Sequence, residues 1–136
     1  MPREESLYPA DWVRLAERDW QRVERLLDEH DPGLAGFCLQ QAVEKFLKAF
    51  LLSRGWQLRR IHDLEALLDE AITDDASLED FRGVCQKITP FYFVERYPFV
   101  METGMVEGDV RGCLEQVKEL IEKLRAKIGT DEQETG

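Results

Sequence analysis

The chain has 136 residues, of which 43% are hydrophobic and 34% are charged, and its formal net charge is −10. This length supports one hydrophobic core and is too short for two ordinary domains. No apolar run approaches the roughly 18 residues of a membrane span, and the acidic balance argues against broad nonspecific nucleic-acid binding.

The three cysteines, Cys38, Cys85 and Cys113, are odd in number and far apart in the chain. This usage predicts reduced thiols in the core of a cytoplasmic protein, without a disulfide framework or a metal site. The N-terminal residues have no apolar stretch and are too acidic for a targeting peptide. We expect no cofactor. We expect a lead at residues 1–8, a helical domain at 9–128 and a disordered acidic tail at 129–136.

The first predicted helix begins at Pro9 and runs to about Glu29. At about 100° per residue, Asp19 falls close to the centre of its apolar face. A carboxylate at that position is costly to bury unless it is paired with a cation. Asp19 therefore predicts a basic partner on a neighbouring helix. The alternative is a rotated helix that leaves Asp19 at a wet boundary.

The second predicted helix, from about Leu34 to Ser53, is apolar around most of its circumference and must pack on several sides. One narrow polar stripe remains, formed by Gln40, Gln41, Glu44, Lys45 and Lys48. Antiparallel packing of the two helices would bring Lys45 or Lys48 to Asp19. The sequence thus predicts an ion-pair cluster of Asp19, Glu44, Lys45 and Lys48.

A basic run overlaps this helix, because residues 45–60 carry five positive charges and no acid: Lys45, Lys48, Arg54, Arg59 and Arg60. One interpretation is a solvated surface with snorkelling side chains. The other is a small site for an anion or a phosphate group.

Three more helices complete the predicted bundle. The third starts at His62 and Asp63, with Asp63 as N-cap. The fourth starts at Ser77 with Asp80 as a capping-box partner and ends at Pro90. An aromatic stretch follows, predicted as an extended or partly helical segment over the bundle, and the last helix runs from Asp109 to about Ile128. The predicted fold is all-α, an up-and-down bundle of four main helices plus one shorter helix.

Four segments in this order and spacing resemble a known family. They are Asp19 in an amphipathic helix, FCLQQAVEKFLKAFL at 37–51, IHDLEALL at 61–68 and ERYP at 95–98. Together they resemble the HEPN domain, in its small stand-alone prokaryotic form, over nearly the whole chain. The resemblance implies a bundle like the substrate-binding subunit of nucleotidyltransferases, a homodimer, and a minimal nucleotidyltransferase as a partner in toxin–antitoxin modules.

The ribonuclease members of this family carry an Arg-x4–6-His motif near the start of the last helix. This sequence departs from that pattern, since no histidine follows His62. Arg96 and Arg111 therefore lack the histidine that metal-free RNA cleavage would use. Arg59 and Arg60 precede His62 with the wrong spacing. The departure argues against ribonuclease activity.

The candidate ligand-binding residues are Lys45, Lys48, His62, Arg96 and Tyr97. The two lysines bind a phosphate or only neutralise Asp19. His62 contacts a ligand at a helix start, or has a capping or packing role. Arg96 and Tyr97 clamp and stack a nucleotide base, or form a local ion pair and a lid over the core. No catalytic residue is assigned.

Three functions fit the sequence. The favoured one is a non-catalytic HEPN protein that binds a nucleotide or a nucleotidyltransferase partner in a two-component module. The alternatives are an RNA-cleaving toxin, which the missing motif disfavours, and a dimeric adaptor without a ligand. In the adaptor, the polar stripe is only an internal ion-pair network.

Overall fold

The computed structural model describes residues 6–93 and 107–135, with side chains as far as residue 129. Arg96 and Tyr97, two of the predicted ligand-binding residues, lie outside the described residues. The roles that the sequence suggests for them, a nucleotide clamp or a lid, therefore stay predictions.

The described residues form helices and no strand, which confirms the predicted all-α bundle. Three α-helices are long and two are short. Their bounds are α1 (Pro9–Asp28), α2 (Pro32–Ser53), α3 (Leu64–Ile72), α4 (Arg82–Ile88) and α5 (Glu107–Thr135), with 3-10 segments η1 (Ala76–Phe81) and η2 (Thr89–Phe93) before and after α4.

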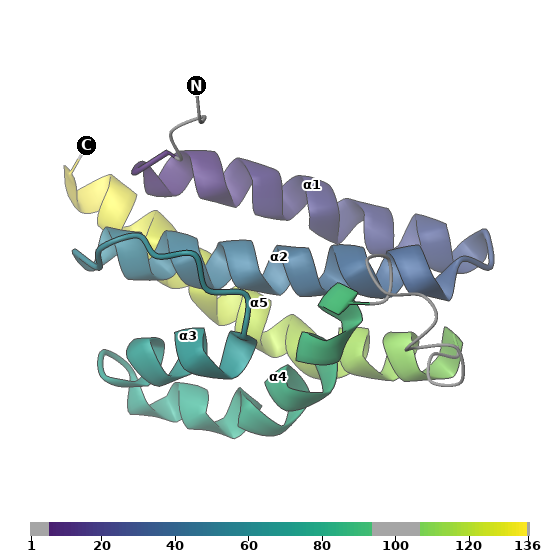
Figure 1. Cartoon of the computed structure of the whole chain (residues 1–136). Coiled ribbons are helices and arrows are strands. Elements are labelled where there is room, and N and C mark those ends of the chain that lie inside the picture. The colour runs from purple at the N-terminus through teal and green to yellow at the C-terminus, as the bar shows by residue number, and fades with distance from the viewer. Residues whose placement is uncertain (1–5, 94–106, 136) are drawn as a thin grey trace.

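Helix α2 lies at the centre of the bundle (Figure 1). Helix α1 runs antiparallel along one side of it, α5 crosses behind it, and α3 and α4 pack below it. This position follows from the sequence of α2, because an apolar circumference must be covered on several sides. Phe46, Leu47 and Phe50 are among its fully buried side chains.

Local signals set several helix ends. Asp31 accepts a hydrogen bond from the Leu34 backbone N–H (3.2 Å), and Asp63 accepts one from Glu65 (3.0 Å), as N-cap residues do. Gly55 follows α2 with φ of +88°, a left-handed conformation that glycine adopts without a steric penalty. The predicted start of α3 after Asp63 and the glycine near the end of α2 thus have direct structural counterparts.

Two predicted boundaries differ from the structure. The segment around Ser77 is a 3-10 helix whose cap is Asp75, so the expected Ser77–Asp80 capping box is wrong. Asp75 lies two residues before Ser77 and accepts a hydrogen bond from the Ser77 backbone N–H, so Asp75 takes the capping position. Helix α5 continues to Thr135, past Ile128, the last buried apolar residue of the helix and its predicted end.

Asp75 also joins η1 to α5, which makes this contact pH-dependent. Its carboxylate accepts a hydrogen bond from the Ser77 hydroxyl (2.7 Å) and lies 2.9 Å from Lys127 Nζ. Hydrogen bonds to this carboxylate, first from Lys127 and then from Ser77, lower the pKa of Asp75 from 3.8 to about 2. Since the folded-state pKa is the lower one, the stabilisation is complete above about pH 4 and is lost as pH falls through about 2.

We therefore expect Asp75→Asn to lower the free energy of unfolding by about 1 kcal/mol at neutral pH, a value discounted because the Lys127 side chain is 33% exposed. The difference from the unsubstituted protein should shrink between about pH 4 and pH 2. Urea unfolding at several pH values measures it. A difference that stays constant over this range would contradict the proposed ionic contact.

The three cysteines are buried as free thiols. Burial raises the pKa of each, and that of Cys85 reaches about 12. No described helix combines the length and the apolar character needed to cross a membrane.

Candidate functional site

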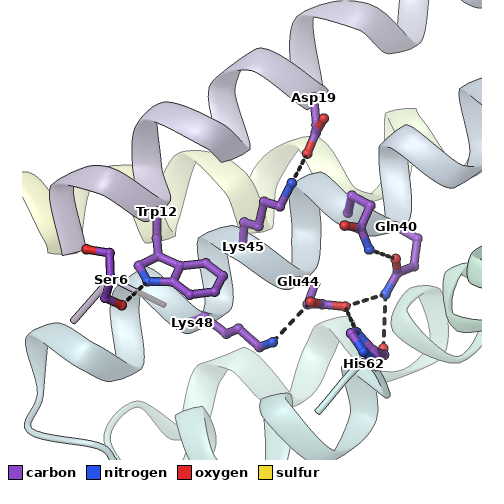
Figure 2. Close-up of polar contacts among 9 residues, drawn as sticks. Ser6, Trp12, Asp19, Gln40, Glu44, Lys45, Lys48 and His62 are labelled. Carbon is purple, nitrogen blue, oxygen red and sulfur yellow. Dashed lines mark hydrogen bonds and ion pairs between the residues drawn. The ribbon is translucent and has the colours of Figure 1, made fainter. Parts of the chain in front are cut away.

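The polar stripe of α2 holds a buried ion pair. Lys48 Nζ lies 3.1 Å from Glu44 Oε2, one helical turn away, and the two residues are only 2% and 3% exposed. Helix α1 covers them from one side and the connection after α2 from the other (Figure 2). A buried pair of this kind needs further hydrogen bonds to offset the loss of water.

Gln40 and His62 supply those hydrogen bonds. Glu44 Oε1 accepts one from the Gln40 side chain (3.0 Å) and contacts His62 Nδ1 at 3.0 Å (Figure 2). The same Gln40 nitrogen donates to the His62 backbone carbonyl (3.0 Å). Gln40 therefore fixes the loop backbone, and Glu44 orients the imidazole with its proton on Nδ1.

A second ion pair joins α2 to α1. Lys45 Nζ lies 2.6 Å from Asp19 Oδ2, and Arg22 approaches the other carboxylate oxygen at 3.9 Å. Asp19 is 8% exposed, on the core-facing side of α1. The carboxylate predicted to need a cation thus has one, and Lys45 rather than Lys48 provides it.

A groove of about 620 Å³ opens beside these two pairs. Its walls come from the start of α1, the polar stripe of α2 and the connection before α3. Trp12 forms an apolar part of the wall, donating its indole N–H to the Ser6 carbonyl (2.7 Å), with Lys48 Nζ 5.4 Å from its ring centre. The lining residues are Ser6, Asp11, Trp12, Arg14, Leu15, Gln41, Glu44, Lys45, Lys48, Arg60 and His62.

The predicted binding residues Lys45, Lys48 and His62 all line this groove. The predicted basic run is divided, however. Arg54 lies 2.9 Å from Asp74, and Arg59 lies 2.9 Å from Glu70. Those two arginines pair with acids at other places on the bundle, so the run does not form one patch.

Four residues of the site are neither among the binding candidates nor in the ion-pair cluster predicted from the sequence. Arg14 and Arg60 line the groove beside the lysines. Gln40 links α2 to the loop, and Tyr92 stacks on the His62 ring with centroids 4.5 Å apart and planes at 16°. Their contacts join segments far apart in the chain. Only Gln40, in the polar stripe of α2, and Arg60, in the basic run, carried a local signal.

The groove presents groups that can bind an anion, together with the carboxylates of Asp11 and Glu44. His62 is 47% exposed, and with Nδ1 held by Glu44 its Nε2 remains available to a ligand. Among the described residues, no three His, Cys, Asp or Glu side chains are grouped to hold a metal ion. Cationic groups, an imidazole and an indole face the same space.

Comparisons with known proteins agree with this architecture. A model described as the HEPN domain matches residues 9–127. The crystal structure of TT1696 from Thermus thermophilus matches with a TM-score of 0.73 and 24% identity, covering 90% of this chain and 97% of that one. ST0689, described as an archaeal HEPN homologue, matches with a TM-score of 0.70 and 25% identity, covering 89% and 98%. The comparison with curated proteins found no match.

Proposed function

Because this chain belongs to the HEPN domain family, whose model matches residues 9–127, we propose that it is a non-catalytic, nucleotide-binding member. The phosphate groups of a nucleotide bind in the groove between α1, α2 and the connection before α3. The protein acts as a homodimer and as the partner of a minimal nucleotidyltransferase in a two-component, toxin–antitoxin-like module.

The observation that carries the binding proposal is the position of Arg60. Within the described part of the chain, Arg60 has no acidic partner, and it lines the groove that also contains Arg14 and His62. A guanidinium group presents a planar fork of donors that matches phosphate oxygens. An unpaired arginine in a concave site is therefore suited to bind a phosphate.

The two lysines have a different part in this proposal. Lys48 is held by Glu44, and Lys45 is held by Asp19. They neutralise buried acids first, so the groove does not repel an anion. Lys45 is 20% exposed, which leaves donors for a phosphate oxygen. The indole of Trp12 offers the apolar surface on which a base could stack.

A second candidate, RNA cleavage, is favoured by one observation, the contact between Glu44 and His62 (3.0 Å). A carboxylate that orients an imidazole can make it a proton acceptor. The sequence argues against this candidate, because no histidine follows His62, and the pair that has the family's spacing, Arg25 and His30, lies at the end of α1 and not near the start of the last helix.

We test binding by the melting temperature with ATP, GTP, CTP and UTP, for the unsubstituted protein, Arg60→Gln and Arg59→Gln. Ligand at ten times its Kd adds about 1.4 kcal/mol of stability, a rise of about 5 °C. We expect this rise in the unsubstituted protein and in Arg59→Gln, whose arginine lies outside the groove, and its loss in Arg60→Gln.

No rise with any nucleotide would overturn the binding proposal and favour the ligand-free adaptor. An equal rise in all three proteins would move the binding site away from Arg60. Incubating each protein and His62→Ala with RNA tests the second candidate, which requires cleavage that disappears in His62→Ala. Co-purification with a nucleotidyltransferase encoded beside this chain would support the partner role.

A further inference from the structure

A row of arginines follows the exposed side of α1. Arg14, Arg18, Arg22 and Arg25 recur every three or four residues and are exposed. This spacing places them along one face of a helix. Arg14 and Arg22 make only long contacts with acids of their own helix, at 3.7 and 3.9 Å.

Arg18 and Arg25 have no ion-pair partner among the described residues. This is unusual for this protein, in which acids outnumber basic residues 28 to 18. Most arginines elsewhere in the described structure contact acids at 3.1 Å or less: Arg54, Arg59, Arg82, Arg111 and Arg125. The row on α1 is therefore a cationic face that the fold itself does not neutralise.

A row of glutamates follows the exposed side of α5. Glu115, Glu119 and Glu122 are spaced four and three residues apart and are exposed. Glu115 pairs with Lys118 at 2.9 Å on the same helix. In the described part of the chain, Glu119 and Glu122 have no ion-pair partner. The spacing of this row matches that of the arginines.

The two rows lie on helices that are neighbours and antiparallel. Contacts across their seam join Glu17 to Arg125, Glu24 to Lys118 (4.0 Å) and Asp28 to Arg111 (3.1 Å). The number on α5 falls as the number on α1 rises, and Figure 1 shows the end of α5 beside the start of α1. A shallow hollow of about 270 Å³ marks the seam, lined by Trp20, Gln21, Glu24 and Leu114.

We propose that this face binds a second copy of the chain, about a two-fold axis parallel to α1 and α5 along the seam. Such a rotation lays α1 of each copy over α5 of the other. A two-fold axis that ran across the two helices instead of along them would lay α1 of one copy over α1 of the other, so that arginines would face arginines. A self-complementary patch of this kind is what a two-fold dimer requires.

The seam contacts also set the register of the proposed pairs. Since Glu17 is level with Arg125 and Glu24 is level with Lys118, Arg18 comes within about half a helical turn of Glu122 in the other copy. The same register places Arg22 opposite Glu119, and Arg25 opposite Glu115, of the other copy. Trp20, half-buried in the hollow, lies close to the axis and supplies an apolar anchor.

A second copy fits this face better than a nucleic acid does. A nucleic-acid strand bound along the arginines would place its phosphates close to the glutamate row on the neighbouring helix. It would also approach the surface of a protein with net charge −10. Like charges placed opposite each other are strongly unfavourable at an interface. The proposal rests on the dimer part of the proposed function and is independent of nucleotide binding in the groove.

The test is a charge exchange at Arg18 and Glu122. We expect the unsubstituted protein to be a dimer by sedimentation equilibrium at low salt, with a Kd that weakens as salt screens the pairs. Arg18→Glu and Glu122→Arg should each weaken the dimer by roughly tenfold or more, the order of magnitude for reversed interfacial charges. The double variant Arg18→Glu/Glu122→Arg should recover most of the affinity.

Asp69→Arg is the matched control, because Asp69 is an exposed acid on α3, which packs on α2, η1 and α4 and not along the seam. It should leave the dimer unchanged, and circular dichroism of every variant checks folding. A monomeric unsubstituted protein, or single variants that dimerise normally, would overturn the proposal, as would a double variant no better than the singles. Nucleotide-dependent melting shifts that persist in monomeric Arg18→Glu separate this interface from the groove.

Discussion

Replacing Lys48 with methionine is expected to lower the free energy of unfolding by about 3–5 kcal/mol, because it leaves the charge of Glu44 buried without its cation. Glu44 is only 3% exposed, and the ammonium group of Lys48 lies directly against its Oε2. Methionine matches the length of the lysine stem, so the loss reports the charge and not a cavity. Urea unfolding at neutral pH measures it.

The double variant Glu44→Gln/Lys48→Met is the informative control. It removes both charges, while the amide that replaces the carboxylate keeps a polar partner for the neighbouring loop, so most of the lost stability should return. Lys45→Met is a second control, since Lys45 is 20% exposed and Asp19 keeps Arg22 nearby. Lys45→Met should lower the free energy of unfolding clearly less than Lys48→Met does. A double variant as unstable as Lys48→Met would show that packing, rather than charge, governs this position.

Phe46→Ala should destabilise the protein by about 3–5 kcal/mol. Phe46 is fully buried in the middle of α2, and the guanidinium carbon of Arg125 lies 5.4 Å from its ring centre. The substitution removes apolar burial, opens a cavity in the central helix and leaves α5 without this contact. Thermal and urea unfolding of the purified variant measure the loss.

Tyr8→Ala is a matched control, because the Tyr8 side chain is 73% exposed and outside the core. It should change the free energy of unfolding by no more than about 0.5 kcal/mol. Phe46→Leu keeps most of the side-chain volume, and its loss in free energy of unfolding should lie between those of Phe46→Ala and Tyr8→Ala. If Phe46→Ala were as mild as Tyr8→Ala, α2 would not be the central packing element that its burial indicates.

These stability effects determine which variants can test the groove. Lys48 and Glu44 are structural enough that a lost ligand could follow from a disturbed bundle. Arg60 is exposed and makes no ion pair within the described residues. A change at Arg60 therefore separates ligand binding from folding, with the adjacent Arg59 as its control.

Much of the fold could be predicted because it rests on local patterns. The 3.6-residue period of apolar side chains predicts α1 and α2, and Asp63 and Gly55 mark nearby ends through their own backbone preferences. The need of Asp19 for a cation also follows locally, since a carboxylate on an apolar face is costly unless paired. The end of α5 and the cap of η1 were missed, because the helix continues to Thr135 beyond its last buried apolar residue, Ile128, and because Asp75 caps η1 in place of Ser77.

The sequence by itself thus determined an all-α bundle centred on α2 and one narrow polar stripe on that helix, and it favoured an ion pair between Asp19 and a lysine of that stripe. These follow from periodicity and from the cost of burying charge. Only the tertiary structure decided that Lys45 pairs with Asp19 while Lys48 pairs with Glu44, and that Arg60 joins the groove while Arg59 does not. Such choices depend on the rotation and register of packed helices, which bring together residues that no local pattern connects.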